Sequence, residues 1–491
     1  MKRLLLTASL LALAGCKVGP NYAVPDLPVP PRFVEATAAV PGTLAAADPS
    51  RWWTQFNDPE LDRLITRAIA GNLDLQTAKT RIAGARAQER EARSALLPSA
   101  NGTAGVNRVD FSKNAGLASL ASAFGGGGSG GGAGGGSTPG QGIALPGSGI
   151  TTWSIGIDAS WEVDLFGGIQ RGIEGARART AAAEWNVRDM QVSVVAEVAS
   201  DYLMLRSLQS QIAIAKAELA RQQGTLRLIS ARQTAGLVSE LPQRQQSLQL
   251  SNVAATLPQL EARSRDQIHA IGVLVGEAPG TLVAELDPAA ALPAFSPALP
   301  AGLPSDLLRR RPDIRAAERQ LAAATADIGV ATADLYPKFN LMGMAELIST
   351  NLASLFARNS LQTTENAAFT LPIFDGGKRR GVIAEREASR VEALLTYKKT
   401  VLVAVQDVED ALADYNAELR RNAELRRGVD TAQRATQLAQ ASFVTGLTDF
   451  QPVLDAQGAV LSNRNTLAQS DASLLTDLAR LYKALGGGWE A

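Results

Sequence analysis

Apolar positions follow two different periods along this chain of 491 residues. From 172 to 235 and from 381 to 445 they recur every three or four residues with few interruptions, which predicts two very long helices. In the second stretch the apolar positions keep a heptad spacing: Val401, Val405, Val408, Leu412, Tyr415 and Leu419. A helix of about 64 residues is roughly 95 Å long, which is far too long for a compact globular domain.

A Gly-Leu pair ends each long stretch, and a second helical pattern follows it. The pairs are Gly236-Leu237 and Gly446-Leu447. Glycine is typical of this position at the end of a helix, because it adopts the left-handed backbone conformation without steric cost. Each half of the chain therefore predicts an antiparallel helical hairpin whose tip is the Gly-Leu turn.

Between these helical stretches the period changes to two. Residues 152–164 alternate strictly, with Trp153, Ile157 and Trp161 on an apolar face and polar side chains on the other, which predicts a two-sided strand. Weaker alternation predicts three further strands, at 100–109, 338–347 and 366–374. The four strands are expected to form two hairpins.

Trp153 and Trp161 are expected to anchor a strand at the two interfaces of a membrane. They lie eight positions apart on one face, which is roughly 26 Å along a strand. At a tilt of ~40° this spacing fits the apolar band of an outer-membrane strand. A strand of a soluble sandwich is the alternative. No apolar run is long enough for a spanning helix, so we expect any membrane crossing to use strands.

The chain repeats its order of helices, strands and glycines. Pro98 and Pro337 each end an Ala-rich helical stretch, at an offset of 337 − 98 = 239. The double glycines at Gly167 and Gly376 have an offset of 376 − 167 = 209, because the first copy carries a Gly-rich insertion. Matched landmarks at so long a period indicate an internal duplication.

The N-terminus carries an export signal. Lys2 and Arg3 precede an apolar stretch that is too short to span a bilayer. The stretch ends Leu-Ala-Gly-Cys, which is similar to a bacterial lipobox, so Cys16 is expected to carry covalent lipid and to begin the mature protein. Cys16 is the only cysteine. Lys17 follows it, which by the same similarity favours the outer membrane.

The composition points to neither nucleic acid nor catalysis. The 48 basic and 48 acidic residues cancel, so nothing in the charge suggests a nucleic-acid partner. The sequence has no Cys/His cluster and no recognisable nucleophile constellation, so we expect no metal, no cofactor apart from the lipid, and no enzyme. His269, the only histidine, is expected to be a packed helical residue, and the Gly-rich segment 125–149 a surface loop.

The expected organisation has five parts. They are a signal peptide (1–15), the lipidated Cys16 with an extended tether (16–57), a first repeat (58–286), a Pro-rich linker (287–304) and a second repeat (305–488). Each repeat contains a helix, a β-hairpin and a long α-hairpin, and the first helix is expected to run from 58 to about 97.

Four strands cannot close a sheet within a bilayer. An open edge in hydrocarbon leaves backbone groups unpaired, at several kcal/mol each, and transmembrane barrels begin at eight strands. We therefore expect two, three or four copies of the chain to pool their strands, with the long hairpins in the periplasm. Three functions remain open at this point: a duct for small molecules, a duct for secreted polypeptides, and a coiled-coil spacer that transports nothing.

Five stretches carry a resemblance to a known family: Cys16–Tyr22, Trp52–Phe56, Trp161–Gly167, Leu308–Ile314 and Tyr482–Trp489. Together they resemble the outer membrane factor family (TolC/OprM-like), and within it the NodT-type outer-membrane lipoproteins that serve resistance–nodulation–division (RND) efflux pumps. The resemblance covers almost all of the mature sequence.

The resemblance implies a mainly α fold with a small membrane β part. Three chains would form a 12-stranded β-barrel and a tunnel of 12 helices built from α-hairpins. The implied partners are a periplasmic adaptor, an inner-membrane RND transporter and outer-membrane lipid. The implied function is a passive, periplasm-spanning exit duct of a tripartite efflux pump for small molecules such as antibiotics, and a type I secretion duct for polypeptides is the alternative.

The resemblance also gives roles to residues near the hairpin tips. The tip residues are similar to adaptor-docking sites: Gly236, Leu237, Ser239, Gly446, Leu447 and Thr448. Asp455 is similar to the aspartate that rings the periplasmic aperture, where three converging carboxylates would repel anions and could bind a cation. An ordinary solvated helix aspartate is the alternative, and Gln451 and Pro452 depart from the family pattern nearby.

Overall fold

The structure is a computed structural model, and it describes residues 17–26, 33–35, 49–110, 149–293 and 310–489. The expected signal peptide and Cys16, the expected lipidation site, lie outside the described residues. Most of the Gly-rich segment, up to 148, and the linker from 294 onward lie outside them as well.

The chain divides into two compact units. Of the described residues, the strand unit comprises 17–21, 88–110, 149–175 and 325–387, and the hairpin unit comprises 22–26, 33–35, 49–87, 176–293, 310–324 and 388–489. Each unit draws segments from both halves of the duplicated sequence, so the duplication does not produce two separate domains.

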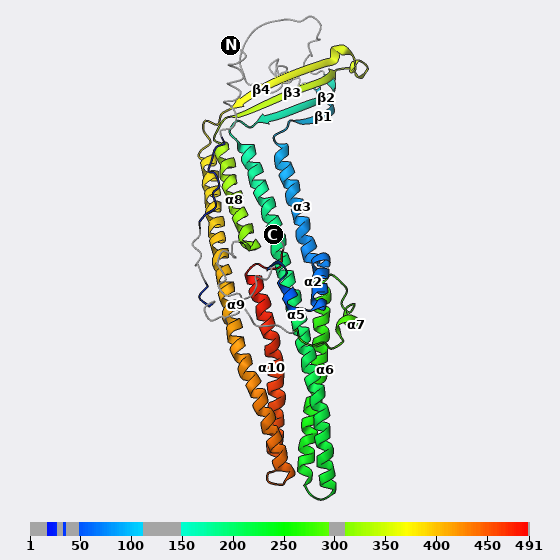
Figure 1. The fold of residues 1–491 in the computed structure, drawn as a ribbon. Coiled ribbons are helices and arrows are strands. Elements are labelled where there is room, and N and C mark those ends of the chain that lie inside the picture. Colours follow the sequence, from blue (N-terminus) through cyan, green and yellow to red (C-terminus); the bar gives the residue numbers. More distant parts are fainter. Residues whose placement is uncertain (1–16, 27–32, 36–48, 111–148, 294–309, 490–491) are drawn as a thin grey trace. The chain divides into compact units, whose positions relative to one another are not determined.

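The described chain is mainly helical (Figure 1). Its helices, in chain order, are η2 (Pro49–Phe56), α2 (Pro59–Gly71), α3 (Leu73–Ser94), α5 (Gly168–Thr234), α6 (Glu240–Leu274), α7 (Val283–Leu286), α8 (Pro312–Ala333), η4 (Leu352–Ser354), η5 (Arg358–Ser360), α9 (Lys378–Val444) and α10 (Gln451–Ala484). The two very long helices predicted from the apolar spacing are confirmed as α5 and α9, each of 67 residues. With α6 and α10 they form the two predicted hairpins.

The helix expected from 58 to about 97 is broken into α2 and α3 at Asn72. The buried Asn72 has an extended backbone (φ −58°, ψ 127°), and its side-chain oxygen accepts from the amide of Leu75 at 2.9 Å. Its side-chain nitrogen donates to the carbonyl of Leu274 at 2.9 Å. An asparagine side chain that bonds the backbone in this way competes with the helix, which explains the break.

Residues 49–56 belong to the core of the hairpin unit. Trp52 is 1% exposed, stacks on Tyr482 with ring centroids 5.4 Å apart, and meets Phe56 edge-on at 6.0 Å. Tyr202 of α5 donates from its hydroxyl to the Asp58 carboxylate at 2.6 Å. The tether expected up to residue 57 therefore ends earlier, because its aromatic residues are core residues.

The strand unit contains one antiparallel sheet of four strands in the order β1-β2-β3-β4 (Figure 1). The strands are β1 (Ser99–Asp110), β2 (Gly149–Val163), β3 (Lys338–Ser349) and β4 (Leu361–Thr370). The first three lie close to their predicted ranges. The fourth was predicted too late in the chain, because alternation continues toward Pro372, which has no amide proton to donate to a ladder.

The N-terminal residues 17–21 are bound within the strand unit through Arg171. This side chain is 2% exposed. Its Nε donates to the carbonyl of Val18 at 3.1 Å, and its Nη2 donates to the carbonyl of Gly19 at 3.3 Å. Nη2 also donates to the side-chain oxygen of Asn21 at 2.7 Å, and Nη1 donates to Glu174 at 2.9 Å.

Glycines make this binding possible by allowing close approach of the backbone. Gly19 has a positive φ of 84°, and a Cβ there would lie 2.5 Å from the Cα of Gly329. A Cβ on Gly329 would lie 2.7 Å from the Cγ of Arg171. We call Arg171, Gly19 and Gly329 the N-terminal socket. The expected tether is thus held against the strand unit at its start instead of hanging free.

Replacing Arg171 with alanine should release residues 17–21. The change leaves two backbone carbonyls and one carboxylate without their buried partner, at a cost of about 3 kcal/mol. Hydrogen exchange measured by mass spectrometry should show faster exchange in this segment.

Arg380→Ala is the matched control, because Arg380 holds the corresponding position in the second repeat and is exposed. It should leave exchange at 17–21 unchanged. Equal protection of the segment in the Arg171 variant would contradict the socket.

Candidate functional site

The sheet has one continuous apolar face. Strand register sets Ile157 of β2 beside Gly102 of β1 and Ala345 of β3, and it sets Trp161 beside Leu341. Ile157 is 63% exposed and Ile155 is 40% exposed. The predicted apolar side of β2 thus extends over neighbouring strands and is exposed in the part of the chain that the structure describes, as expected of a surface that meets lipid.

The opposite face of the sheet is polar. Asn101 of β1 lies beside Asp158 of β2, and its side-chain nitrogen donates to that carboxylate at 3.1 Å. Ser99 and Ser160 bond through their hydroxyls at 2.9 Å. Further polar residues on this face are Thr103, Asn107, Ser154, Glu346, Gln362, Thr364 and Asn366. Water can solvate this face.

Trp153 and Trp161 lie on the apolar face, as predicted. Trp153 pairs with Val106 and Ser349, near one end of the sheet. Trp161 is 37% exposed, and its indole nitrogen donates to the carbonyl of Leu96 at 3.0 Å. An apolar ring with a bonded polar end suits a membrane interface, and the anchoring role stays a prediction.

The two outer strands have open edges. Among the described strands, β1 pairs only with β2, and β4 pairs only with β3. Each edge strand therefore presents a row of backbone groups without a ladder partner among the described residues. Such an edge is a template for pairing with another strand.

Both Gly-Leu turns have the predicted geometry. Gly236 and Gly446 have φ values of 73° and 78°. The amide of Leu237 donates to the carbonyl of Arg232, and the amide of Leu447 donates to that of Ser442, each at 2.9 Å. This pattern closes a helix with a left-handed glycine. Leu237 and Leu447 are 68% and 79% exposed, so both tips offer an apolar side chain.

The remaining tip residues flank the second helix of each hairpin. Ser239 is the residue before α6 and makes no side-chain cap bond. Thr448 is exposed between Leu447 and α10. Adaptor docking at the tips stays a prediction.

A small apolar cluster joins the two tips side by side. It consists of Ile229 of α5, Phe443 of α9, and Phe450 and Val453 at the start of α10. The rings of Phe443 and Phe450 have centroids 5.0 Å apart, and the Arg232 guanidinium lies 5.2 Å from the Phe443 ring centroid. The two tips therefore form one surface rather than two independent ones.

Asp455 lies on the first turns of α10, close to this surface. Its carboxylate is exposed and accepts from the side-chain nitrogen of Gln451 at 2.8 Å. Gln451 accepts in turn from Gln245 of α6 at 3.3 Å. Gln451 departs from the family pattern, yet it orients the Asp455 carboxylate. The aperture role of Asp455 stays a prediction.

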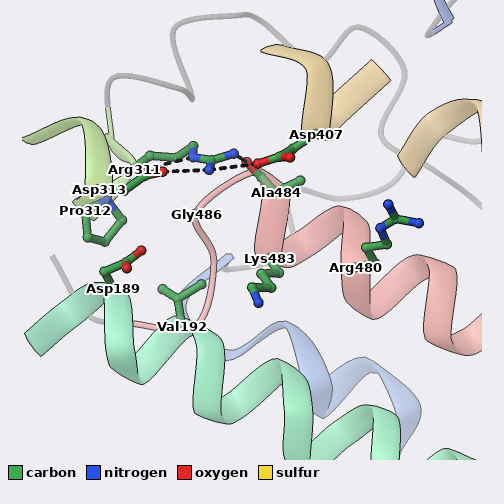
Figure 2. Close-up of a pocket in the computed structure, with 10 residues that line it drawn as sticks. All are labelled: Asp189, Val192, Arg311, Pro312, Asp313, Asp407, Arg480, Lys483, Ala484 and Gly486. Atoms are coloured by element: carbon green, nitrogen blue, oxygen red, sulfur yellow. Dashed lines mark hydrogen bonds and ion pairs between the residues drawn. The ribbon is translucent and has the colours of Figure 1, made fainter. Parts of the chain in front are cut away.

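Sequence analysis missed a charged cluster around Arg311 (Figure 2). Arg311 is 8% exposed and bonds Asp313 at 2.7 Å and Asp407 of α9 at 3.0 Å. It also donates to the carbonyl of Ala484, at the end of α10, at 2.8 Å. Arg311 thus ties α8, α9 and α10 together beside a cavity of about 250 Å³.

Asp189 of α5 lines the same cavity. Burial and the nearby Asp313 carboxylate raise its pKa. Arg311 and Asp313 belong to the stretch Leu308–Ile314 that carried the family resemblance, but that stretch contains no information about the distant partners Asp407 and Asp189.

Asp477 of α10 lies in a second cavity, of about 560 Å³, which Arg263 and Asp266 of α6 also line. The pKa of Asp477 is raised to about 6, chiefly by burial and also by the carboxylates of Asp414 and Glu418, against a lowering effect of Arg480.

Within the described segments, no helix is both long and apolar enough to cross a membrane. The same segments hold no group of three or more His, Cys, Asp and Glu side chains that could bind a metal ion. His269 lies partly buried in α6.

Comparisons with known proteins cover nearly the whole chain. A family model described as outer membrane efflux protein matches residues 64–277 and 303–487. Nodulation protein T of Rhizobium leguminosarum bv. viciae is 31% identical over 98% of this chain and 92% of its own. The pyoverdine export outer membrane protein OpmQ of Pseudomonas aeruginosa is 31% identical over 100% and 98%. The solved structure of the outer-membrane channel OprN matches 96% of this chain and 100% of its own, with 33% identity and a TM-score of 0.84.

Asp477→Asn should stabilise the protein at pH 7.5. The folded pKa of about 6 exceeds the unfolded value of about 3.9, so the native carboxyl favours folding at low pH and opposes it as pH rises through 6. The carboxyl is partly exposed, so the gain is about 1 kcal/mol after allowance for screening. Thermal unfolding followed by circular dichroism should show a higher midpoint for the variant at pH 7.5 and a smaller difference at pH 4.5.

Asp430→Asn serves as the control. Asp430 forms an exposed ion pair with Arg434 at 3.0 Å, and such pairs contribute little. A pH-independent effect of Asp477→Asn would contradict the assigned pKa.

Proposed function

The chain belongs to the outer membrane efflux protein family, and on that premise we propose that it is the outer-membrane exit duct of a tripartite efflux pump. The observation that carries the proposal is the sheet of the strand unit. It has an exposed apolar face, a polar face and two open edges. That combination suits a wall that separates lipid from water once its edges are paired.

Three copies of the chain would pair all these edges. Each copy supplies four strands, so a homotrimer closes twelve strands around a water-filled bore. The polar faces with Asn101, Asp158 and Asn366 would line the bore, and the apolar faces would meet outer-membrane lipid. Closure removes the cost of unpaired backbone groups in hydrocarbon.

The hairpin unit would continue the wall in the periplasm. Its part of α5, residues 176–234, has 234 − 175 = 59 residues, or about 90 Å of helix. Helices of this length suit a duct that bridges a compartment. The duct is passive, so the proposal includes no catalysis and no cofactor apart from the lipid on Cys16.

The lipid anchor would lie close to the strand unit. The amide of Val18 donates to the carbonyl of Phe166, in the connection between β2 and α5, at 3.2 Å. Cys16 is two residues away along the chain. A lipid on Cys16 would therefore enter the periplasmic leaflet beside the strands.

The hairpin tips would dock a periplasmic adaptor, which connects the duct to an inner-membrane RND transporter. The exposed Leu237 and Leu447 supply apolar contact area, and the apolar cluster around Phe443 fixes their relative position. The relative named for pyoverdine export favours a small-molecule cargo over a polypeptide.

Two measurements on the full-length protein test this function. The purified protein should conduct ions in planar lipid bilayers, and deletion of its gene should raise sensitivity to small toxic compounds. A deletion that impaired only the secretion of a polypeptide would favour a type I secretion duct. A protein that never conducts would contradict both readings.

The Leu237→Asp, Leu447→Asp double variant should separate conduction from pumping. A charge on each exposed tip leucine removes apolar contact with the adaptor without changing the helices. We expect normal conductance in bilayers and loss of resistance in the complemented deletion strain. Wild-type resistance would show that these leucines do not dock a partner.

Asp455→Asn should make the duct less selective for cations. A ring of carboxylates attracts cations and repels anions, so the reversal potential in a salt gradient should shift toward zero. Asp449→Asn is the control, because Asp449 is an exposed acid in the neighbouring turn. An unchanged reversal potential would mean that Asp455 is a solvated helix residue outside the aperture.

A further inference from the structure

One strand register matches the open edge of β4 in one copy to the open edge of β1 in another copy. We propose that β4 of one copy pairs antiparallel with β1 of the next copy, so that Glu365 lies opposite Arg108 of that copy. The inference rests on the proposed function, because it requires copies of the chain to close the sheet. Three independent observations lead to this register.

The first observation is the internal duplication. β1 (Ser99–Asp110) corresponds to β3 (Lys338–Ser349) at the same offset as Pro98 to Pro337, 338 − 99 = 239. The pair Ala100–Ala159 of β1 and β2 then corresponds to the pair Phe339–Phe369 of β3 and β4. The offset between β2 and β4 is therefore 369 − 159 = 210, the same as between the tip glycines 236 and 446.

When these two offsets are applied to the pairing of β2 with β3, they give a pairing of β4 of one copy with β1 of the next copy. Within the chain, Ile155 of β2 pairs with Leu347 of β3. An offset of 365 − 155 = 210 leads from Ile155 to Glu365, and an offset of 347 − 108 = 239 leads from Leu347 to Arg108. The chain thus contains a template for the contact between its own copies.

The second observation is the alternation of faces. Glu365 pairs with Gly343 and therefore lies on the apolar face, beside Ala367 and Phe369. Arg108 lies two residues from Val106, which pairs with Trp153 on the same face. The proposed register keeps the apolar face of one copy against that of the next, with Ala367 opposite Val106 and Phe369 opposite Ala104, and a slip of one residue would oppose the two faces.

The third observation is charge. On the apolar face of the four described strands the charged residues are Arg108, Asp110 and Glu365. A lone charge that faces lipid costs up to about 2–4 kcal/mol. Arg108 forms an ion pair with Asp110 within the chain, at 3.2 Å, and the proposed register places Glu365 of the neighbouring copy opposite the same guanidinium. A slip of two residues in one direction would set Glu365 against Asp110, and in the other direction against Val106.

The polar face gains matched partners in the same register. Gly156–Glu346 in the chain corresponds to Asn366 opposite Asn107 between copies. Ser160–Met342 corresponds to Thr370 opposite Thr103. Asn–Asn and Thr–Thr pairs can hydrogen-bond across an antiparallel edge.

The connections between the strands and the helices offer a related apolar contact, although Phe166 and Phe374 are offset by 374 − 166 = 208. Phe166, between β2 and α5, stacks on Tyr336 after α8 with centroids 4.8 Å apart. The matching places in the other repeat are the connection between β4 and α9, with Phe374, and the end of α3, with Leu97. Phe374 and Leu97 are 92% and 68% exposed in one chain. The proposed pairing of β4 with β1 would bring Phe374 of one copy close to Leu97 of the next copy.

Cysteine pairs between copies test the register. Asn366→Cys is combined in turn with Gly105→Cys, Asn107→Cys and Val109→Cys, and the full-length proteins are oxidised in outer-membrane vesicles. Directly opposed residues have Cα atoms about 4.5–5.5 Å apart, within disulfide reach. A two-residue offset exceeds that reach. We expect covalent trimers on non-reducing gels from the Asn107→Cys pair and little cross-linking from the other two.

The possible cross-linking results distinguish a wrong register from a wrong proposed function. The pair Asn101→Cys with Asp158→Cys controls oxidation, because it joins β1 to β2 within one chain. Preferred cross-linking through Gly105→Cys or Val109→Cys, or none in a protein that assembles, overturns the register alone. A wild-type protein that stays monomeric overturns the proposed function itself.

A charge cycle tests the ion pair. Arg108→Gln removes the guanidinium that faces both Asp110 and Glu365, so it should lower the temperature at which the oligomer dissociates in detergent. Glu365→Gln leaves Arg108 with Asp110 and should lower that temperature less. The double variant leaves only the Asp110 carboxylate charged on this face and should be more stable than Arg108→Gln alone. Asp110→Asn keeps the proposed Arg108–Glu365 pair and should also cost less than Arg108→Gln. Additive losses in the double variant would contradict the pairing of Glu365 with Arg108.

Discussion

The structure depends on one constraint: the backbone groups along the outer edges of β1 and β4 have no ladder partner among the described residues. The sheet cannot lie in hydrocarbon with these edges open, because each unsatisfied N–H or C=O costs several kcal/mol. The exposed apolar face cannot lie in water at low cost either. The proposed assembly with other copies of the chain would satisfy both requirements.

The two halves of the duplicated sequence contribute the same kinds of elements to this architecture. Each half provides two strands and one hairpin, and the same glycine geometry closes both tips, with φ values of 73° and 78°. The two halves differ, however, in the burial of one arginine position. Arg171 is buried in the N-terminal socket, whereas Arg380, at the corresponding position, is exposed. One repeat therefore holds the N-terminal segment, and the other keeps the same position open.

Much of the fold was predictable because its signals are local. Helical spacing over 67 residues, strict alternation in β2 and glycine at a left-handed turn each depend on neighbours in sequence. The break at Asn72, the socket of Arg171 and the cluster of Arg311 were not predictable in this way. Arg171 bonds Asn21, 150 residues away, and Arg311 bonds Asp407, 96 residues away. Such partners are set by packing, and one sequence contains no sign of them.

In the proposed duct β2 separates lipid from water, and spin labels along this strand would reveal whether it does. Labels at successive positions from Ser154 to Ala159 would be introduced into the full-length protein in lipid bilayers. Their accessibility to oxygen and to a water-soluble nickel complex would then be measured by electron paramagnetic resonance. The account predicts a period of two, with positions 155, 157 and 159 in contact with lipid and positions 154, 156 and 158 in contact with water. Equal water accessibility at all six positions would contradict it.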